Sequence, residues 1–252
     1  MDEQPSIDTS VAHVARVYNY WLGGTDNFAA DRAAGDQAIA AYPDMVSSVR
    51  ANRAFLARTV GYLAGPAGIR QFLDIGTGIP SANNTHEVAQ SVAPEARVVY
   101  VDHDPIVLAH ARALLASTPA GMTSYLDADL RDTAKVLQAA AQTLDFSRPV
   151  AVMLMAMLQH IDDAEDPYGT VATLLGAVPV GSYLVLSHPA SDMAAAMGQV
   201  AQRLNQVMVQ KVTLRGQAQV ARFFDGLDMV EPGLVRVQEW RPRSAAEANS
   251  PA

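Results

Sequence analysis

A glycine-containing stretch of nine residues holds the residue types that could bind a small ligand. It reads FLDIGTGIP over residues 72–80, an apolar segment that predicts a strand running into a Gly-x-Gly turn. Gly76 and Gly78 lack side chains, so the backbone around Thr77 can approach a ligand at the carboxyl edge of a sheet. A helix that opens after the turn adds electropositive N–H groups at the same place. The stretch therefore predicts a ligand-binding turn made of Gly76, Thr77 and Gly78.

Asp74 indicates which ligand this turn accepts. In dinucleotide-binding proteins such a turn cradles a pyrophosphate, which an adjacent carboxylate would repel. The third glycine of the dinucleotide pattern is also absent, because Ser81 occupies its place. S-adenosylmethionine (SAM) carries an α-ammonium and a sulfonium group, and a carboxylate attracts both. Asp74 therefore favours SAM over a nicotinamide cofactor and makes an oxidoreductase the less favoured alternative.

Carboxylates also follow the next two predicted strands. Asp102 is placed to accept hydrogen bonds from both ribose hydroxyls, and His103 beside it could lie against the adenine. Asp129 could accept a hydrogen bond from the adenine amino group while the backbone of Leu130 reads the ring edge. The carboxyl ends of parallel strands meet at one edge of a sheet. Together with Asp74, these residues predict a single cofactor cleft there.

His160 is the candidate catalytic residue. It lies just past Met155 at the end of the fourth predicted strand, where we expect the backbone to run beside the transferred methyl. An imidazole there could take a proton from a hydroxyl or amine acceptor. Neighbouring Met and Leu side chains would lower its pKa and keep it neutral at pH 7. His86 and His188 are weaker candidates. No histidine pair has metal-ligand spacing on one helix, so we expect no metal site.

The order of these motifs resembles that of class I SAM-dependent methyltransferases over residues 70–190. A narrower resemblance, to an actinobacterial family of candidate SAM-dependent methyltransferases once catalogued only as a domain of unknown function, spans nearly the whole chain. It implies the fold and SAM as the cofactor, but no acceptor. In the family pattern a short strand follows the last motif, where this chain has a Ser/Ala/Pro-rich tail. The matching segments are ARVYNYWLGGTDNFAADR at 15–32, NRAFL at 52–56, NTHEVAQ at 84–90 and EWRP at 239–242.

The segment before the first strand is expected to cover the cofactor. Its first helix, capped by one of residues 8–10, carries Tyr18 and stops at Gly23-Gly24. The polar bend that follows, including Asn27, is not needed for a hydrophobic core, so we interpret it as part of a lid. Trp21 fits ordinary core packing. Arg53 fits either a solvated helix charge or a partner for the cofactor carboxylate, and we favour the former.

The elements that must position these residues form an α/β fold. Strands alternating with helices predict a Rossmann-like parallel sheet with helices on both faces and an N-terminal helical extension. We assign residues 1–66 to the extension, 67–243 to the SAM-binding domain and 244–252 to a disordered tail. Expected strands are 71–75, 97–101, 123–126, 150–154 and 183–186, with a last long or broken strand at 227–240. Expected helices are 29–41, 45–63, 84–92, 106–116, 133–144, 168–178 and 192–209.

Composition limits the remaining function classes. The chain has 252 residues, half of them hydrophobic and 17% charged, which is enough to bury a sizeable core. Its formal net charge is −8 with no long basic run, which argues against nucleic-acid binding. No apolar run could span a bilayer. Cysteine is absent, and the opening MDEQPSIDTS is unlike a secretory signal. We therefore expect a soluble cytoplasmic protein.

These observations favour methyl transfer from SAM to a small-molecule acceptor. The sequence does not identify that acceptor, the methylated atom or the oligomeric state. A SAM-binding sensor or partner protein without transferase activity is the alternative, and only product formation distinguishes the two.

Overall fold

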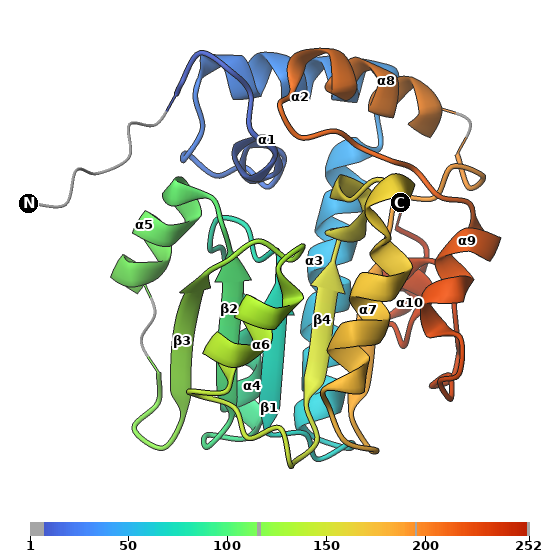
Figure 1. Cartoon of the computed structure of the whole chain (residues 1–252). Coiled ribbons are helices and arrows are strands. Elements are labelled where there is room, and N and C mark those ends of the chain that lie inside the picture. Colours follow the sequence, from blue (N-terminus) through green and yellow to red (C-terminus); the bar gives the residue numbers. More distant parts are fainter. Residues whose placement is uncertain (1–7, 115–116, 195, 251–252) are drawn as a thin grey trace, which may run out of the picture.

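Five parallel strands form the centre of the molecule. The computed structural model describes residues 8–114, 117–194 and 196–250. The strand order is β3-β2-β1-β4-β5, so the direction of winding reverses between β1 and β4 (Figure 1). The α/β fold expected from the sequence is confirmed, and the bounds of these five strands lie within one residue of their expected positions. The strands are β1 (Gln71–Ile75), β2 (Arg97–Asp102), β3 (Met122–Asp127), β4 (Ala151–Met155) and β5 (Tyr183–Ser187).

Helices cover both faces of this sheet because its central strands are apolar on both sides. Phe72 packs into one core with α3 and α4, while its neighbour Leu73 points to the other face and packs with α6 and α7. This two-residue alternation is the geometry of an extended strand. The helices that connect the strands are α4 (Thr85–Val92), α5 (Pro105–Leu114), α6 (Thr133–Ala140) and α7 (Pro167–Gly176). Residues 115–116, expected to end one helix, lie outside the described residues.

Four helices form a cover over the carboxyl ends of the strands. Figure 1 shows α1, α2 and α8 lying above the strand ends, with α3 descending from this layer along the sheet. Buried residues of all four helices share one apolar cluster that includes Val17, Trp21, Ala38, Val49 and Leu204. The 20 residues of α3 span about 30 Å, enough to join cover and sheet. The four are α1 (Val14–Trp21), α2 (Ala29–Ala41), α3 (Met45–Ala64) and α8 (Met197–Val207).

Two of these helices begin later than the sequence predicts. Asp8 does not cap α1, because its carboxylate accepts hydrogen bonds from the backbone and hydroxyl of Ser10. The chain stays extended through Ala12, which bridges to Met208, and α1 begins at Val14. Asp192 likewise does not open α8, because it accepts from the backbone N–H of Gln217 at 2.9 Å. Side chains that bond to local backbone elsewhere favour turns over helix.

The strand expected at 227–240 is wrong. Gly233 has φ of +84°, and Pro232 before it has no N–H to donate to a sheet. The segment turns instead and enters the short helix η4 (Val237–Glu239), whose end is fixed when Arg58 Nε donates to Trp240 O at 2.9 Å. Among the described residues, no strand follows β5.

The remaining short helices lie mainly in the C-terminal part. Residues 244–250, expected as a disordered tail, differ from that expectation: Ser244 Oγ accepts from the backbone N–H of Glu247, and Glu247 lies 3.5 Å from Arg58 Nη1. None of the described helices is long and apolar enough to cross a membrane. The short helices are η1 (Leu158–His160), η2 (Asp163–Glu165), α9 (Gln217–Ala221), η3 (Arg222–Phe224) and α10 (Ala245–Ala248).

Candidate cofactor and acceptor site

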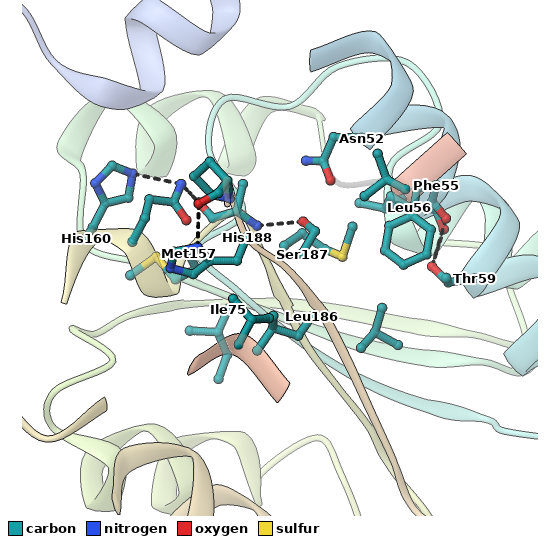
Figure 2. A pocket seen from close by; sticks show the side chains of 18 of the residues that line it. Asn52, Phe55, Leu56, Thr59, Ile75, Met157, His160, Leu186, Ser187 and His188 are labelled. Atoms are coloured by element: carbon teal, nitrogen blue, oxygen red, sulfur yellow. Dashed lines mark hydrogen bonds between the residues drawn. The ribbon is translucent and has the colours of Figure 1, made fainter. Parts of the chain in front are cut away.

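A cavity of about 1260 Å³ extends from the carboxyl ends of the strands, beneath the cover, and along β5 to residues 226–240 of the C-terminal segment. It reaches the point between β1 and β4 where the winding of the sheet reverses, the usual ligand site of such folds. A site for one small molecule typically measures about 300–1,000 Å³, and this space is larger because it continues beyond the strand ends along β5. Part of its wall is drawn in Figure 2.

The glycine turn at this cavity depends on backbone conformations that other residues rarely adopt. Gly76 and Gly78 have φ of +76° and +63°. The N–H of Gly76 donates to Val101 O at 2.8 Å, which ties the turn to β2. A side chain added at Gly76 would overlap that of Met157. Both glycines and Thr77 line the cavity, as the sequence predicts.

Asp102 is held in place by three backbone N–H groups. Its Oδ2 accepts from Gly78 at 2.9 Å, and its Oδ1 accepts from His103 at 2.8 Å and Asp104 at 3.1 Å. Burial raises the pKa of Asp102, and these hydrogen bonds act in the opposite direction. A carboxylate has about four acceptor positions, so one remains for a ligand. Both Asp102 and His103 line the cavity.

Asp74 is a buried carboxyl group with a single close partner. It is 4% exposed, and its Oδ2 accepts from Thr85 Oγ1 at 2.6 Å. Burial raises its pKa to about 6, even though the Thr85 hydroxyl and the positive charge of Arg53 lower it. Asp74 lines the cavity, and none of the described residues places a cation in direct contact with it, so a cationic ligand group beside it would favour its ionised form.

Of the remaining residues predicted for the cofactor, Leu130, Met155 and Tyr18 line the cavity. Asp129 is not among the described lining residues. Its carboxylate instead accepts from the backbone of Arg131 at 2.9 Å and from the guanidinium of Arg131 at 3.2 Å. These bonds pair the partly exposed carboxylate of Asp129 with Arg131, two residues past the end of β3.

The Gly23-Gly24 bend is also separate from the described lining. Asn19 organises this bend, since its Oδ1 accepts from the Asp26 backbone and from Asn27 Nδ2, each at 3.0 Å. A side chain on Gly24 would overlap that of Asn19. Gly24 is therefore needed for a tight turn after α1, a reason that the sequence pattern does not reveal.

Two histidine–carboxylate contacts connect the cover to the cofactor end of the cavity. His13, at the start of α1, lies with Nδ1 2.8 Å from Oδ2 of Asp104, two residues past Asp102. Asp26, in the bend after α1, lies 3.4 Å from Nε2 of His110 on α5. Inside the cover, Arg16 Nε donates to Asp31 Oδ1 at 3.0 Å, and both side chains are buried.

His160 lines the cavity with one ring nitrogen already bonded. Its Nδ1 lies 3.2 Å from Lys211 O, and a carbonyl only accepts, so Nδ1 carries the hydrogen. Nε2 therefore carries the lone pair, and the Gln159 amide nitrogen lies 3.4 Å from it. Burial lowers the pKa of His160 to about 4. The ring is neutral at pH 7, as the sequence analysis anticipates.

His188 and His86 have structural partners. His188 Nδ1 lies 2.9 Å from Pro189 O, and Arg215 Nη1 donates to its Nε2 at 3.1 Å, so both ring nitrogens are occupied. Burial lowers the pKa of His188 to about 4. His86 Nδ1 lies 2.8 Å from the hydroxyl of Tyr100. Among the residues that the structure describes, no acidic and histidine side chains group as metal ligands would.

Sequence reasoning missed the polar residues that face the cavity from within apolar segments. Gln159 precedes His160, and Asn52 and Ser48 lie one turn apart on α3. Thr85, the partner of Asp74, also went unassigned. Asn52 and Thr85 fall inside the resemblance segments, which is the one signal that could have indicated them.

The chain is similar to known proteins in both sequence and structure. The sequence profile of a family described as S-adenosyl methyltransferase matches residues 1–252. A DUF574-family protein from Streptomyces avermitilis is 48% identical, with a TM-score of 0.93 over 97% of this chain and 94% of that one. A candidate methyltransferase from Thermobifida fusca is 42% identical, with a TM-score of 0.89 over 95% of this chain and 90% of that one. No curated protein matches the chain.

Proposed function

Because the chain belongs to the S-adenosyl methyltransferase family, we propose that it transfers the methyl group of SAM to a small-molecule acceptor in the cavity at the strand ends. One observation carries the proposal. The glycine turn and the carboxylate of Asp102 are joined directly at the edge of a cavity that lies at the strand ends beneath the cover and continues along β5.

The donor set at this edge fits the chemistry of SAM. The Asp74 carboxylate, which has no cation in direct contact in the part of the chain that the structure describes, suits the α-ammonium. Gly76, Thr77 and Gly78 permit a close backbone approach. Asp102 has one acceptor position left, which suits one ribose hydroxyl rather than the two expected from the sequence. A pyrophosphate would meet two carboxylates here, so the fit to a dinucleotide is poor.

Adenine would lie among His103, Leu130 and Met155. His103 directly follows Asp102 at the end of β2, Leu130 follows the adjacent strand β3, and Met155 ends β4, which lies beyond β1; all three line the cavity. A contact between Asp129 and the adenine amino group would require Asp129 to leave Arg131. The Leu130 backbone alone can supply a donor and an acceptor to the ring edge.

When bound, SAM supplies a methyl group on a positively charged sulfur atom. The protein then contributes position and enclosure, since in-line displacement gains most from holding the reactants in the correct geometry. The cover of α1, α2, α3 and α8 would exclude water, and Tyr18 and the bend of Gly23, Gly24 and Asn27 would belong to this lid. The His13 and Asp26 contacts would hold the lid against α5 and the loop before it.

His160 is the proposed proton acceptor. Its pKa of about 4 makes it a weak base, suited to a hydroxyl acceptor that becomes strongly acidic once methylated. An amine acceptor would not need it, because the amine attacks through its free electron pair. The role of His160 therefore depends on the acceptor.

Calorimetry with SAM, S-adenosylhomocysteine and NAD tests the cofactor assignment. We expect binding of the first two and no binding of NAD. Binding of NAD in preference to SAM would refute the proposal. Binding of SAM without turnover of any acceptor would instead favour a sensor.

A further inference from the structure

The part of the cavity that runs along β5, here called the β5 branch, has two long walls. One wall is residues 178–190, which include the loop before β5, the whole strand and the turn after it. The other wall is formed by residues 226–230 and 233–240 of the C-terminal segment. The five residues of β5 span about 17 Å at the usual rise of a strand. The β5 branch is therefore elongated.

Apolar side chains from both layers of the fold reach this branch. Leu184 packs with the core on the α6 and α7 side of the sheet, while its neighbour Tyr183 packs with the core on the α3 and α4 side. β5 ends the strand order, so the branch lies beside the edge of the sheet and between its two layers. The apolar lining residues that are only partly buried are Tyr62, Val178, Tyr183, Leu184, Leu234 and Val237.

Charged groups are confined to one wall of the branch. Residues 178–190 include no Asp, Glu, Lys or Arg. The charged lining residues of the C-terminal wall are Asp228, Arg236 and Glu239, and all three are exposed. Partly buried apolar walls gain free energy when an apolar group replaces water against them. The branch therefore suits the apolar part of a ligand.

The β5 branch is continuous with the proposed methyl-transfer site. Ser187, the last residue of β5, is paired in register with Met155 at the end of β4, and neighbouring strands lie about 4.8 Å apart. Ser187 Oγ also accepts from the backbone N–H of Ala156 at 3.0 Å. Figure 2 shows Leu186 and Ser187 among the side chains that line the pocket. A molecule with its reactive group near Met155 can thus place the rest of its length along β5.

We propose that the methyl acceptor is an elongated molecule with an apolar chain, which lies along β5 against residues 226–240 while the reactive group lies at the strand ends. This inference rests on the proposed function and names the class of its second substrate. A compact or highly charged acceptor would leave the apolar walls uncovered. Affinity for acceptor-like molecules should therefore rise with the length of an apolar chain.

Three phenols that differ only in chain length test the inference. They are 4-ethylphenol, 4-butylphenol and 4-octylphenol, which share one hydroxyl group. Equilibrium dialysis against the wild-type protein with saturating S-adenosylhomocysteine measures their binding. We expect one bound molecule per protein, with affinity rising about two- to fourfold for each added methylene.

The variant Val178→Trp fills the branch with a larger side chain. It should remove the dependence on chain length while leaving the affinities for 4-ethylphenol and S-adenosylhomocysteine unchanged. Val92→Trp is the matched control, because Val92 ends α4, is 47% exposed and is not among the described lining residues. This variant should bind all three phenols as the wild type does.

A second measurement needs no variant and places the chain directly. A 4-octylphenol analogue with a photoreactive diazirine at the end of its chain is irradiated in the wild-type protein, and the labelled peptides are identified by mass spectrometry. We expect label within residues 178–186 or 226–240.

Equal binding of the three phenols to the wild type, no binding of any, or label only outside these two segments would overturn the proposed acceptor class. A folded Val178→Trp variant that keeps the full dependence on chain length would overturn the placement along β5. Failure of the proposed function is a separate result, since it appears as absence of S-adenosylhomocysteine binding to the wild type.

Discussion

The backbone N–H of Gly78 donates a 2.9 Å hydrogen bond to Oδ2 of Asp102. Two segments 24 residues apart in the chain are thereby joined at the carboxyl ends of β1 and β2. The bond orients the carboxylate and also stabilises the left-handed conformation of the turn. A change at Asp102 should therefore affect both the ribose contact and the glycine turn.

Replacing Asp102 with Ala should weaken SAM binding by about 1.5–3 kcal/mol, the range for one hydrogen bond to a charged group. Disorder of the turn would add to this loss. Titration calorimetry measures the effect, and Asp225→Ala at an exposed position serves as the control. Unchanged affinity in Asp102→Ala would remove Asp102 from the cofactor site.

The variant Asp129→Ala tests whether Asp129 contacts the adenine, as the sequence predicts, or stays paired with Arg131, as in the structure. Because the Asp129 carboxylate is paired with Arg131 and is not among the described cavity-lining residues, we expect SAM affinity to change less than about twofold. A loss of tenfold or more would show that Asp129 leaves Arg131 to contact the adenine.

SAM affinity should depend on pH near 6. Asp74 has a pKa of about 6 in the free protein, and a bound ammonium would favour its ionised form. Affinity should fall as the pH drops below 6, with a proton released on binding at that pH. Calorimetry at pH 6 in buffers of different ionisation enthalpy measures the proton. Asp74→Asn should bind weakly and without proton release, and a wild-type titration with no proton exchange would contradict the assignment.

The same residue should limit the stability of the free protein. The raised pKa means that folding favours protonated Asp74, so this contribution is complete below the unfolded value near 3.8 and is lost as the pH rises through about 6. Asp74→Asn should therefore stabilise the free protein at pH 8 by up to about 3 kcal/mol, since each pKa unit corresponds to about 1.4 kcal/mol. Thermal unfolding at pH 8 and pH 4 checks this, with little difference expected at pH 4.

The lid should depend on the buried pair of Arg16 and Asp31. Arg16→Met leaves a fully buried carboxylate without its cation and should destabilise the lid by about 3–5 kcal/mol. Hydrogen exchange should become faster in α1 while the amides of β1 stay protected. Arg32→Met, at an exposed position on α2, should have little effect. Equal exchange in both variants would contradict a lid held by this pair.

Sequence alone predicted the sheet well because apolar strand patterns and glycine turns are local signals. The bounds of β1 and α2 agree with the structure, and the turn of Gly76 and Gly78 lies at the cavity. The last strand was mispredicted because the bend at Pro232 outweighs the apolar residues around it.

What sequence could not supply are contacts between distant segments. No local sequence pattern indicates that Arg215 donates a hydrogen bond to the ring of His188, or that Arg131 donates one to the carboxylate of Asp129. The orientation of the Gln159 amide likewise depends on its contact with His160, whose ring is held in turn by the backbone carbonyl of Lys211, a residue distant in the sequence. Such side-chain partners are determined by tertiary packing.

Transfer of label from methyl-labelled SAM to a pool of small-molecule metabolites tests methyl transfer by this protein most directly. We expect a labelled small molecule together with an equal amount of S-adenosylhomocysteine. Both products should be greatly reduced with the variant Asp102→Ala. Tight SAM binding with neither labelled product nor S-adenosylhomocysteine would contradict methyl transfer at this site.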